Sequence, residues 1–285
     1  MIPYRLNPLG VNEFIPLTLM ALADSSKVTL NATGSPTVSG LQYRKRGEQW
    51  SSYPIGTEIQ LNANQYVQFR NTADSLSSST SNYVKFSLTG QFSAFGELIS
   101  MLNNGGACKT LCFVSLFASN SALYSCRDLK FPKTVANSCF QSMFQWCQYL
   151  YRGPRILPAT NLSEGCYGYM FQGCQHLEYM PEIPATTPAR WAYRYMFNYG
   201  GQWNANGMTT TPIRFTTLAD YCCNNMFQNA KINRIEVDFT AWITDGTTNW
   251  VDGVPATGTF VKPLALDGDN PGASRIPSGW NIVNK

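Results

Sequence analysis

Charged side chains and histidines are scarce in this sequence. Aspartate, glutamate, lysine and arginine make up 13% of the 285 residues, and His176 is the single histidine. Metal sites that need two histidine ligands are therefore excluded. The net charge of +4 is small, and the one basic run, at residues 43–46, is too short to neutralise many phosphates. We expect a solvated hairpin end there and no nucleic-acid partner.

Long hydrophobic runs are also missing. No stretch approaches the roughly 20 apolar residues that a membrane span needs, so we expect none. Residues 14–26 are similar to the apolar part of a short secretion signal. The chain still begins at Met1, and the same residues fit a first β-strand, which is the interpretation we prefer. No cysteine precedes Cys108, so a lipoprotein cleavage site is not expected.

Recognisable catalytic motifs are absent as well. The sequence has no P-loop and no GxGxxG. His176 immediately precedes an expected core leucine and should face solvent without a catalytic role. Glu178 and Glu182 are interpreted as surface residues rather than a glycosidase pair. Residues 267–270 lack the later glutamate of a calcium loop and indicate a tight turn. We expect no enzyme activity, no metal and no cofactor, with a carbohydrate-active enzyme kept as a third hypothesis.

The first third of the chain has β-type patterning. Residues 1–13 contain two prolines and a glycine without periodicity, which indicates an extended arm. Apolar and polar residues alternate in 27–33, 57–63 and 65–71, and turn-forming residues separate these stretches. The pattern predicts a small β-sandwich over residues 14–95.

A repeat follows the β-type region. Pairs of Met or Leu with Phe recur at spacings of 27, 27, 26 and 30 residues. A fixed period near 27, with units too small to fold alone, is typical of a solenoid. We therefore predict about five stacked coils over residues 96–235. The pairs begin at Leu116, Met143, Met170, Met196 and Met226.

Apolar residues inside one repeat unit fall four positions apart. Leu162, Cys166, Met170 and Cys174 stand at i, i+4, i+8 and i+12. This spacing predicts a helix of about three turns with one apolar face. Residues 177–183 are expected to be extended. Each coil should then consist of a strand, a turn and a helix.

The nine cysteines raise three alternatives, namely a metal site, disulfides or packing. An odd number leaves at least one thiol unpaired, and no CxxC spacing occurs. Ala192 and Ala230 occupy positions that hold cysteine in other units, which favours packing as a small apolar residue. Disulfides between stacked coils stay open. The predicted repeat core is Cys139, Met143, Phe144, Cys147, Leu150, Cys166, Met170, Phe171, Cys174 and Leu177.

The repeat unit resembles a known family, the leucine-rich repeats of the BspA or Treponema type. The matching positions are Phe171, Cys174, Leu177, Ile183 and Pro184. These units are longer than is usual in that family, and residues 199–212 interrupt the fourth. The resemblance implies a leucine-rich-repeat solenoid.

The end of the chain extends the resemblance. Residues 250–254, 258–262 and 276–280 are similar to a closing module found with such repeats in virion-associated proteins of phages of gut Bacteroidetes. The predicted fold class is thus a multidomain, β-rich protein. It has a β-sandwich, a strand–turn–helix solenoid and a C-terminal cap over residues 236–285.

The resemblance implies a non-enzymatic virion structural protein, assembled in the host cytoplasm. It would be a head fibre or capsid decoration, or a tail-associated protein, and would display the solenoid for adhesion to the host. Its partners would be other capsid or tail proteins. The alternative is a bacterial cell-surface adhesin with leucine-rich repeats. The expected assembly anchor within the arm is Ile2, Pro3, Tyr4, Arg5 and Leu6.

Aromatic residues at variable repeat positions are the candidate binding surface. They either fold back on neighbouring coils or form a patch for a host-surface glycan or protein, because flat rings with polar edges suit both. Homo-oligomerisation stays open. The candidates are Trp146, Tyr149, Tyr151, Tyr179, Tyr195, Tyr199 and Trp203, together with Trp191.

Overall fold

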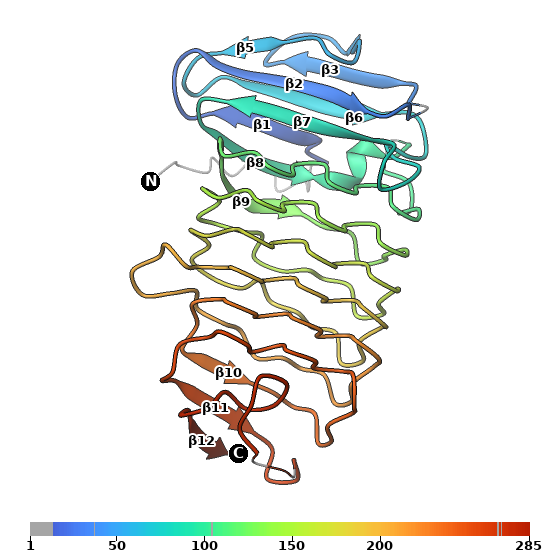
Figure 1. Cartoon of the computed structure of the whole chain (residues 1–285). Coiled ribbons are helices and arrows are strands. Elements are labelled where there is room, and N and C mark those ends of the chain that lie inside the picture. The colour runs from blue at the N-terminus through green and yellow to red at the C-terminus, as the bar shows by residue number, and fades with distance from the viewer. Residues whose placement is uncertain (1–13, 37, 104, 267, 269) are drawn as a thin grey trace, which may run out of the picture.

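The fold combines sheets at the N-terminal end with a column of stacked chain turns. The computed structural model describes residues 14–36, 38–103, 105–266, 268 and 270–285. Figure 1 shows the sheets at one end, the turns below them and three parallel strands at the other end. The predicted arm, with its proposed anchor Ile2 to Leu6, lies outside the described residues.

The larger sheet contains six strands. β8 and β9 are parallel to each other, and the other neighbours are antiparallel. A short 3₁₀ helix, η1 (Leu98–Met101), follows β8. The strand order is β4 (Ser51–Ser52), β3 (Leu41–Lys45), β6 (Tyr66–Asn71), β1 (Leu17–Ala21), β8 (Phe92–Glu97) and β9 (Leu123–Lys130).

A second, antiparallel sheet faces the first. Its order is β5 (Ile59–Leu61), β2 (Ser26–Thr33) and β7 (Tyr83–Thr89). Every second residue is buried in β7 and in the first six residues of β2, as the alternation in the sequence predicts. The ring of Phe69 in β6 meets that of Phe86 in β7 with 5.1 Å between centroids. Inward side chains of the two sheets thus share one core.

The column is joined to the sheets through β7 and β9. The N–H of Phe86 donates to the carbonyl of Leu116 at 2.8 Å. The Asn120 amide accepts from the N–H of Leu88 at 2.8 Å and donates to the carbonyls of Phe86 and Phe117 at 2.7 and 2.8 Å. One buried side chain therefore provides hydrogen-bond partners for backbone groups of β7 and of the first turn of the column.

One side of each coil is a ribbon of consecutive tight turns. Every fourth residue has positive φ, for example Ser138, Ser142 and Trp146 at 50°, 56° and 59°. Alternate N–H groups bond to the carbonyl three residues earlier, and the others bond to the next coil. The N–H of Phe140 donates to the carbonyl of Cys166 at 3.0 Å. The ribbons are residues 111–119, 138–146, 165–173, 191–199, 221–229 and 247–253.

The predicted strand–turn–helix solenoid is wrong. The described residues contain no α-helix, and their strands form three small sheets, none of which makes a solenoid. An α-helix has 3.6 residues per turn, so side chains spaced by exactly four residues would drift around the helix axis. In a ribbon with one positive φ every four residues, the same side chains all point in one direction. Within the described parts of the chain, no helix is long and apolar enough to cross a membrane.

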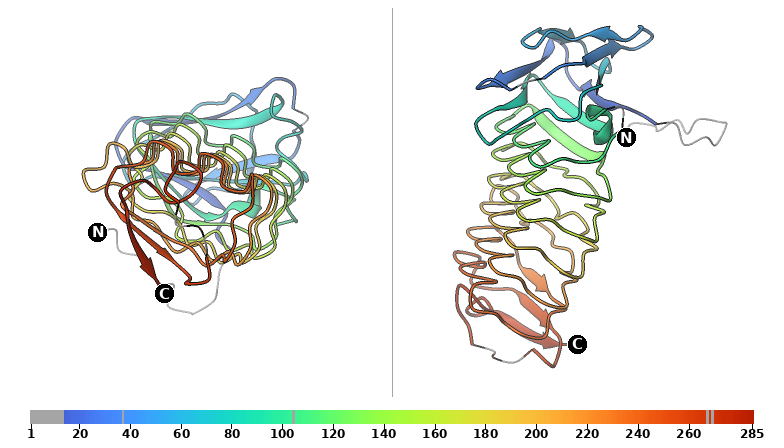
Figure 2. Two further views of the ribbon diagram at one scale, coloured as in Figure 1. Left: turned by 60° about the horizontal axis from the view of Figure 1, so that its bottom comes forward. Right: turned by 90° about the vertical axis from the view of Figure 1, so that its right-hand side faces the viewer.

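The side of the coils opposite the ribbons is extended. Residues 177–183, predicted to be extended, form only isolated parallel bridges, Tyr179 to Thr209 and Glu182 to Ile156. Regular strands appear at the C-terminal end in a parallel sheet of β10 (Arg234–Glu236), β11 (Thr259–Lys262) and β12 (Asn281–Asn284). Figure 2 shows this sheet at the end of the column remote from β1–β8.

Two aromatic ladders run through the middle of the column. In the longer one, successive ring centroids from Phe86 to Trp250 are 5.0–6.2 Å apart. Burying a phenylalanine contributes about 1.5–3 kcal/mol. All ten residues of the predicted repeat core have 0% of their surface exposed. The ladders are Phe86, Phe117, Phe144, Phe171, Phe197, Phe227 and Trp250, and Phe113, Phe140, Tyr167, Tyr193 and Phe215.

Candidate functional site: an exposed aromatic cluster

Three of the eight predicted surface residues meet around His176. The ring centroid of His176 lies 4.9 Å from that of Tyr149, 4.8 Å from Tyr151 and 5.2 Å from Trp203. Tyr124 extends the group, with its ring 6.2 Å from Tyr149 and 5.7 Å from Tyr151. These five residues are called the His176 cluster below.

The repeat explains how these side chains reach the surface. Leu123, Leu150 and Leu177 are equivalent core positions with 0% exposure. In an extended stretch, the residues on either side of a buried one point outward. Tyr124 follows the first of these leucines, Tyr149 and Tyr151 flank the second, and His176 precedes the third. Stacking the coils then aligns the rings in one column.

Trp203 comes from the longer fourth coil. The segment around it is the loop that projects sideways from the column in Figure 1. The N–H of Trp203 donates to the carbonyl of Gln175 at 2.9 Å. The Lys231 ammonium donates to the carbonyls of Asn204 and Ala205, both at 2.9 Å. The loop is thus fixed so that its indole, 51% exposed, packs against His176.

The environment of His176 fixes its tautomer. Its Nδ1 lies 2.9 Å from the carbonyl oxygen of Gln148. A carbonyl only accepts hydrogen bonds, so Nδ1 carries hydrogen and Nε2 of the neutral ring is an acceptor. The described residues include no group of three His, Cys, Asp or Glu side chains that could hold a metal. The cluster therefore offers ring faces, phenol hydroxyls and one imidazole acceptor.

Trp146 and Tyr199 form a neighbouring exposed pair. Their ring centroids are 6.3 Å apart, and the residues are 41% and 38% exposed. The indole lies over Gly173, where a Cβ would come within 2.2 Å of Cε3 of Trp146. Trp146 is three residues before Tyr149, and Tyr199 is four residues before Trp203. The two ribbons that end at Trp146 and Tyr199 therefore lead directly into the cluster.

Tyr179 and Tyr195 lie away from the cluster. The Tyr179 hydroxyl donates to the carbonyl of Gly153 at 2.9 Å, and burial raises its pKa to about 12. The Tyr195 ring stacks on Tyr169 with 5.0 Å between centroids. The predicted list therefore divides into three members of the His176 cluster, one adjacent pair, two separate tyrosines and Trp191, whose ring lies 6.4 Å from that of Tyr221.

The cysteines are free thiols. All nine are unpaired, and eight are buried. Cys147 Sγ donates to the carbonyl of Phe117 at 3.0 Å, and Cys174 Sγ to that of Phe144 at 3.2 Å. Burial raises the pKa of Cys147 to about 12. With their pKa values raised by burial, the Cys147 and Cys174 thiols stay protonated at neutral pH, and each bonds to a carbonyl of the preceding coil.

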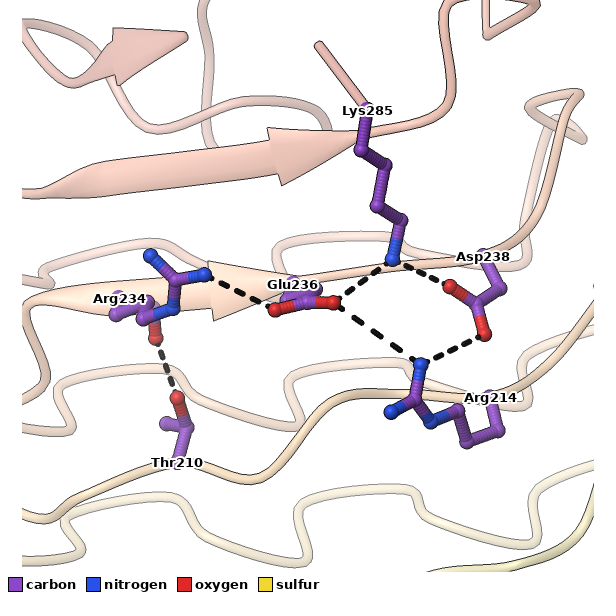
Figure 3. A network of polar contacts seen from close by, with 6 residues as sticks. All are labelled: Thr210, Arg214, Arg234, Glu236, Asp238 and Lys285. Atoms are coloured by element: carbon purple, nitrogen blue, oxygen red, sulfur yellow. Dashed lines mark hydrogen bonds and ion pairs between the residues drawn. The ribbon is translucent and has the colours of Figure 1, made fainter. Parts of the chain in front are cut away.

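A network of charges covers the outward side of β10. Figure 3 shows Lys285 between Glu236 and Asp238, while Arg214 reaches both acids and Arg234 binds Glu236. The Lys285 Nζ lies 2.9 Å from Glu236, and the Arg214 guanidinium 3.3 Å from Asp238. Both acids and all three cations have partners. We therefore interpret the network as a link between successive turns and not as a ligand site.

Two members of the cluster are not among the predicted surface residues. The sequence does not single out Tyr124, and it predicts a solvent-facing His176 without a catalytic role. Both residues are next to a core leucine of the repeat, as Tyr149 and Tyr151 are. Proximity to these leucines is therefore the sequence signal that could have identified them.

No protein-family model matches the chain, and neither a curated protein nor a solved structure is significantly similar to it.

Proposed function

We propose that this is a non-enzymatic binding protein that attaches to a host-surface glycan through the His176 cluster. The observation that carries the proposal is the gathering of Tyr149, Tyr151 and Trp203 around His176, where Trp203 is half-exposed. Flat rings cover the apolar C–H face of a sugar, while hydroxyls and the Nε2 acceptor bind its hydroxyl groups. The core does not need these rings, because two buried ladders already fill it.

We further propose that the protein is part of a phage virion, on the head or on the tail. The resemblance of the repeat units and of residues 250–280 to virion-associated proteins of phages of gut Bacteroidetes supports this proposal. A bacterial surface adhesin is the alternative.

Binding of oligosaccharides released from host envelopes tests the site. We expect saturable binding that weakens at least about tenfold in Trp203→Ala and in Tyr149→Ala, since exposed aromatic anchors dominate such interfaces. Phe14→Ala is the matched control, because this aromatic residue is 50% exposed in the N-terminal region. Equal affinities of wild type and both cluster variants would reject the site, and breakdown of the oligosaccharides by the protein would reject the non-enzymatic assignment.

Immunogold electron microscopy with antibody against the chain tests the location. Gold on phage heads or tails is the expected result and distinguishes decoration from receptor binding. Gold confined to the bacterial envelope would favour the adhesin and contradict the virion assignment.

A further inference from the structure

Bulky aromatic residues occupy left-handed backbone positions on the ribbons. Most other left-handed positions of the column hold small or turn-forming residues, for example Ser142, Gly165, Asn225 and Asn229, although the first ribbon has Leu111. The aromatic residues have φ between 54° and 60°. They are Trp146, Tyr169, Trp191, Tyr195, Tyr199 and Tyr221.

This backbone conformation is unfavourable for large side chains. An L-residue with a Cβ pays about 1–2 kcal/mol in the left-handed region, whereas glycine and asparagine adopt it readily. Ribbons with Ser142 or Asn225 make the same coil-to-coil hydrogen bonds as the ribbon with Tyr195. The fold therefore does not require the rings, and strained residues of this kind concentrate at functional sites.

Two arginines lie among these rings. The Arg190 guanidinium is 3.8 Å from the ring centroid of Trp191, and Arg194 is 5.6 Å from Tyr169 and 5.4 Å from Tyr195. Over the described stretches, no carboxylate lies within 4.0 Å of either arginine. The Nε of Arg194 is buried without a hydrogen-bond partner.

Two other arginines of the column are paired with acids. Arg155 lies 3.1 Å from Asp128, and Arg152 lies 3.5 Å from Glu178. A guanidinium held against aromatic faces and lacking an acid is prepared for an external anion, because its planar donors fit a carboxylate. The absence of a paired acid thus distinguishes Arg190 and Arg194 from these cations.

We propose that this surface binds a carboxylate-bearing sugar of an acidic polysaccharide. The arginine–aromatic face is Tyr169, Arg190, Trp191, Arg194, Tyr195 and Tyr221. The arginines bind the carboxylate, and the rings pack against the apolar face of the sugar. The inference rests on the proposed function in that the ligand is a glycan. It concerns a surface separate from the His176 cluster.

The backbone of this face favours a sugar over an acidic peptide. The N–H of Tyr195 already donates to the carbonyl of Asn224 at 2.8 Å, and the carbonyl of Arg194 accepts from Tyr169 at 2.7 Å. An extended peptide binds to a sheet mainly through free backbone groups at an edge. Here these groups are used between coils, which leaves side-chain faces as the contact surface.

The test uses oligomers of galacturonic acid and their neutral methyl esters as probes. The full chain should bind the acid at least about tenfold more tightly than the ester. Arg194→Gln should lower affinity for the acid by a similar factor. Tyr195→Asn introduces the residue found at position 225, so it should weaken binding while the melting temperature stays unchanged or rises.

Trp203→Ala is the control that separates the two proposals. It should leave the acid affinity unchanged while reducing binding of neutral host oligosaccharides. Equal binding of acid and ester, wild-type affinity in Arg194→Gln and Tyr195→Asn, or equally tight binding of polyglutamate would each overturn the acidic-sugar inference. The His176 cluster would still be tested separately, by the binding of neutral host oligosaccharides to Trp203→Ala and Tyr149→Ala.

Discussion

Single side chains at one repeat position connect three successive layers of the column to the layers before them. The Asn120 amide bonds to the carbonyl of Phe86, the Cys147 thiol to that of Phe117, and the Cys174 thiol to that of Phe144. The first layer meets the edge of β7, where an N–H also needs a partner. An amide supplies both a donor and an acceptor, whereas a thiol donor suffices between coils.

This difference predicts unequal costs of truncation. Asn120→Ala leaves buried backbone groups of Leu88 and Phe86 without partners and should lower the free energy of unfolding by about 2–4 kcal/mol. Cys147→Ala removes one weak bond and some volume, and should cost about 1 kcal/mol. Urea denaturation measures both. Equal losses in the two variants would contradict the assigned role of Asn120.

At the residue scale, the sequence predicted part of the candidate site. Tyr149 and Tyr151 could be recognised because they flank Leu150 in a regular unit. Trp203 was selected as an aromatic residue, but its contact with His176 depends on a loop without repeat register, so no period predicts it. The hydrogen bonds of the thiols depend on the distance between coils, so residue spacing in the sequence could not predict them either.

At the element scale, the ribbons depend on a backbone rule that spacing alone does not distinguish from a helix. Cys166, Met170 and Cys174 share one face in either structure. Gly165, Tyr169 and Gly173, which directly precede these three residues, distinguish the two structures because they have positive φ in the ribbon. Two glycines four residues on either side of Tyr169 are unfavourable inside a helix and were the available signal.

Gly173 tests the ribbon directly. Its φ is 73°, and a Cβ would come within 2.2 Å of the Trp146 ring. Gly173→Ala should cost about 2–4 kcal/mol from backbone strain together with displacement of the indole. Gly47→Ala is the control, because its φ is 81° and its Cβ meets nothing within 4 Å. It should cost about 1 kcal/mol.

A double variant separates strain from the clash. In a Trp146→Ser background, Gly173→Ala should cost no more than Gly47→Ala, since the colliding ring is gone. An undiminished cost in that background would show that the indole does not lie over Gly173.

The charge network makes stability dependent on pH in two windows. The hydrogen bond from Lys285 holds the pKa of Glu236 below its usual 4.5, so its contribution is present above pH 4.5 and is lost as pH falls through the lowered value. Burial lowers the pKa of Lys285, but bonds to Asp238 and Glu236 raise it above 10.5 overall. That contribution is present below pH 10.5 and is lost as pH rises through the raised value.

Lys285→Met removes the centre of the network. At pH 7 it should lower the free energy of unfolding by about 1 kcal/mol, and the difference from wild type should shrink in acid once Glu236 is protonated. Lys27→Met is the control, because Lys27 and Glu58 pair at 2.9 Å with side chains 43% and 53% exposed. A difference that is constant from neutral pH to acid would contradict the network.

At the scale of the whole molecule, the repeat period predicted stacking but not the architecture of a coil. The period reports only the number of residues in each layer. A strand–turn–helix unit and a ribbon unit can have the same number, so the period does not distinguish them. Strand positions near the N-terminus could be predicted because alternation in β2 and β5 reflects a more buried and a more exposed face. β6 lies inside the larger sheet and has buried residues on both faces. The divisions after residues 13, 95 and 235 stay predictions.

The layers at the C-terminal end continue those before them. The N–H of Phe227 donates to the carbonyl of Trp250 at 2.8 Å, and the N–H of Asn229 to that of Asp252 at 2.7 Å. These bonds cross from the predicted repeats into the predicted cap. The column therefore continues from the first ribbon to residue 253, and it carries both the His176 cluster and the arginine–aromatic face.

Hydrogen exchange of the full chain, measured by mass spectrometry with and without oligosaccharides from the host envelope, tests the proposed binding surface most directly. We predict added protection in peptides that cover residues 146–151, 174–178 and 199–207, because a sugar on the His176 cluster shields these turns from solvent. Protection confined to β1–β8, or none at saturating ligand, would contradict the claim that the exposed rings of the column form the binding surface.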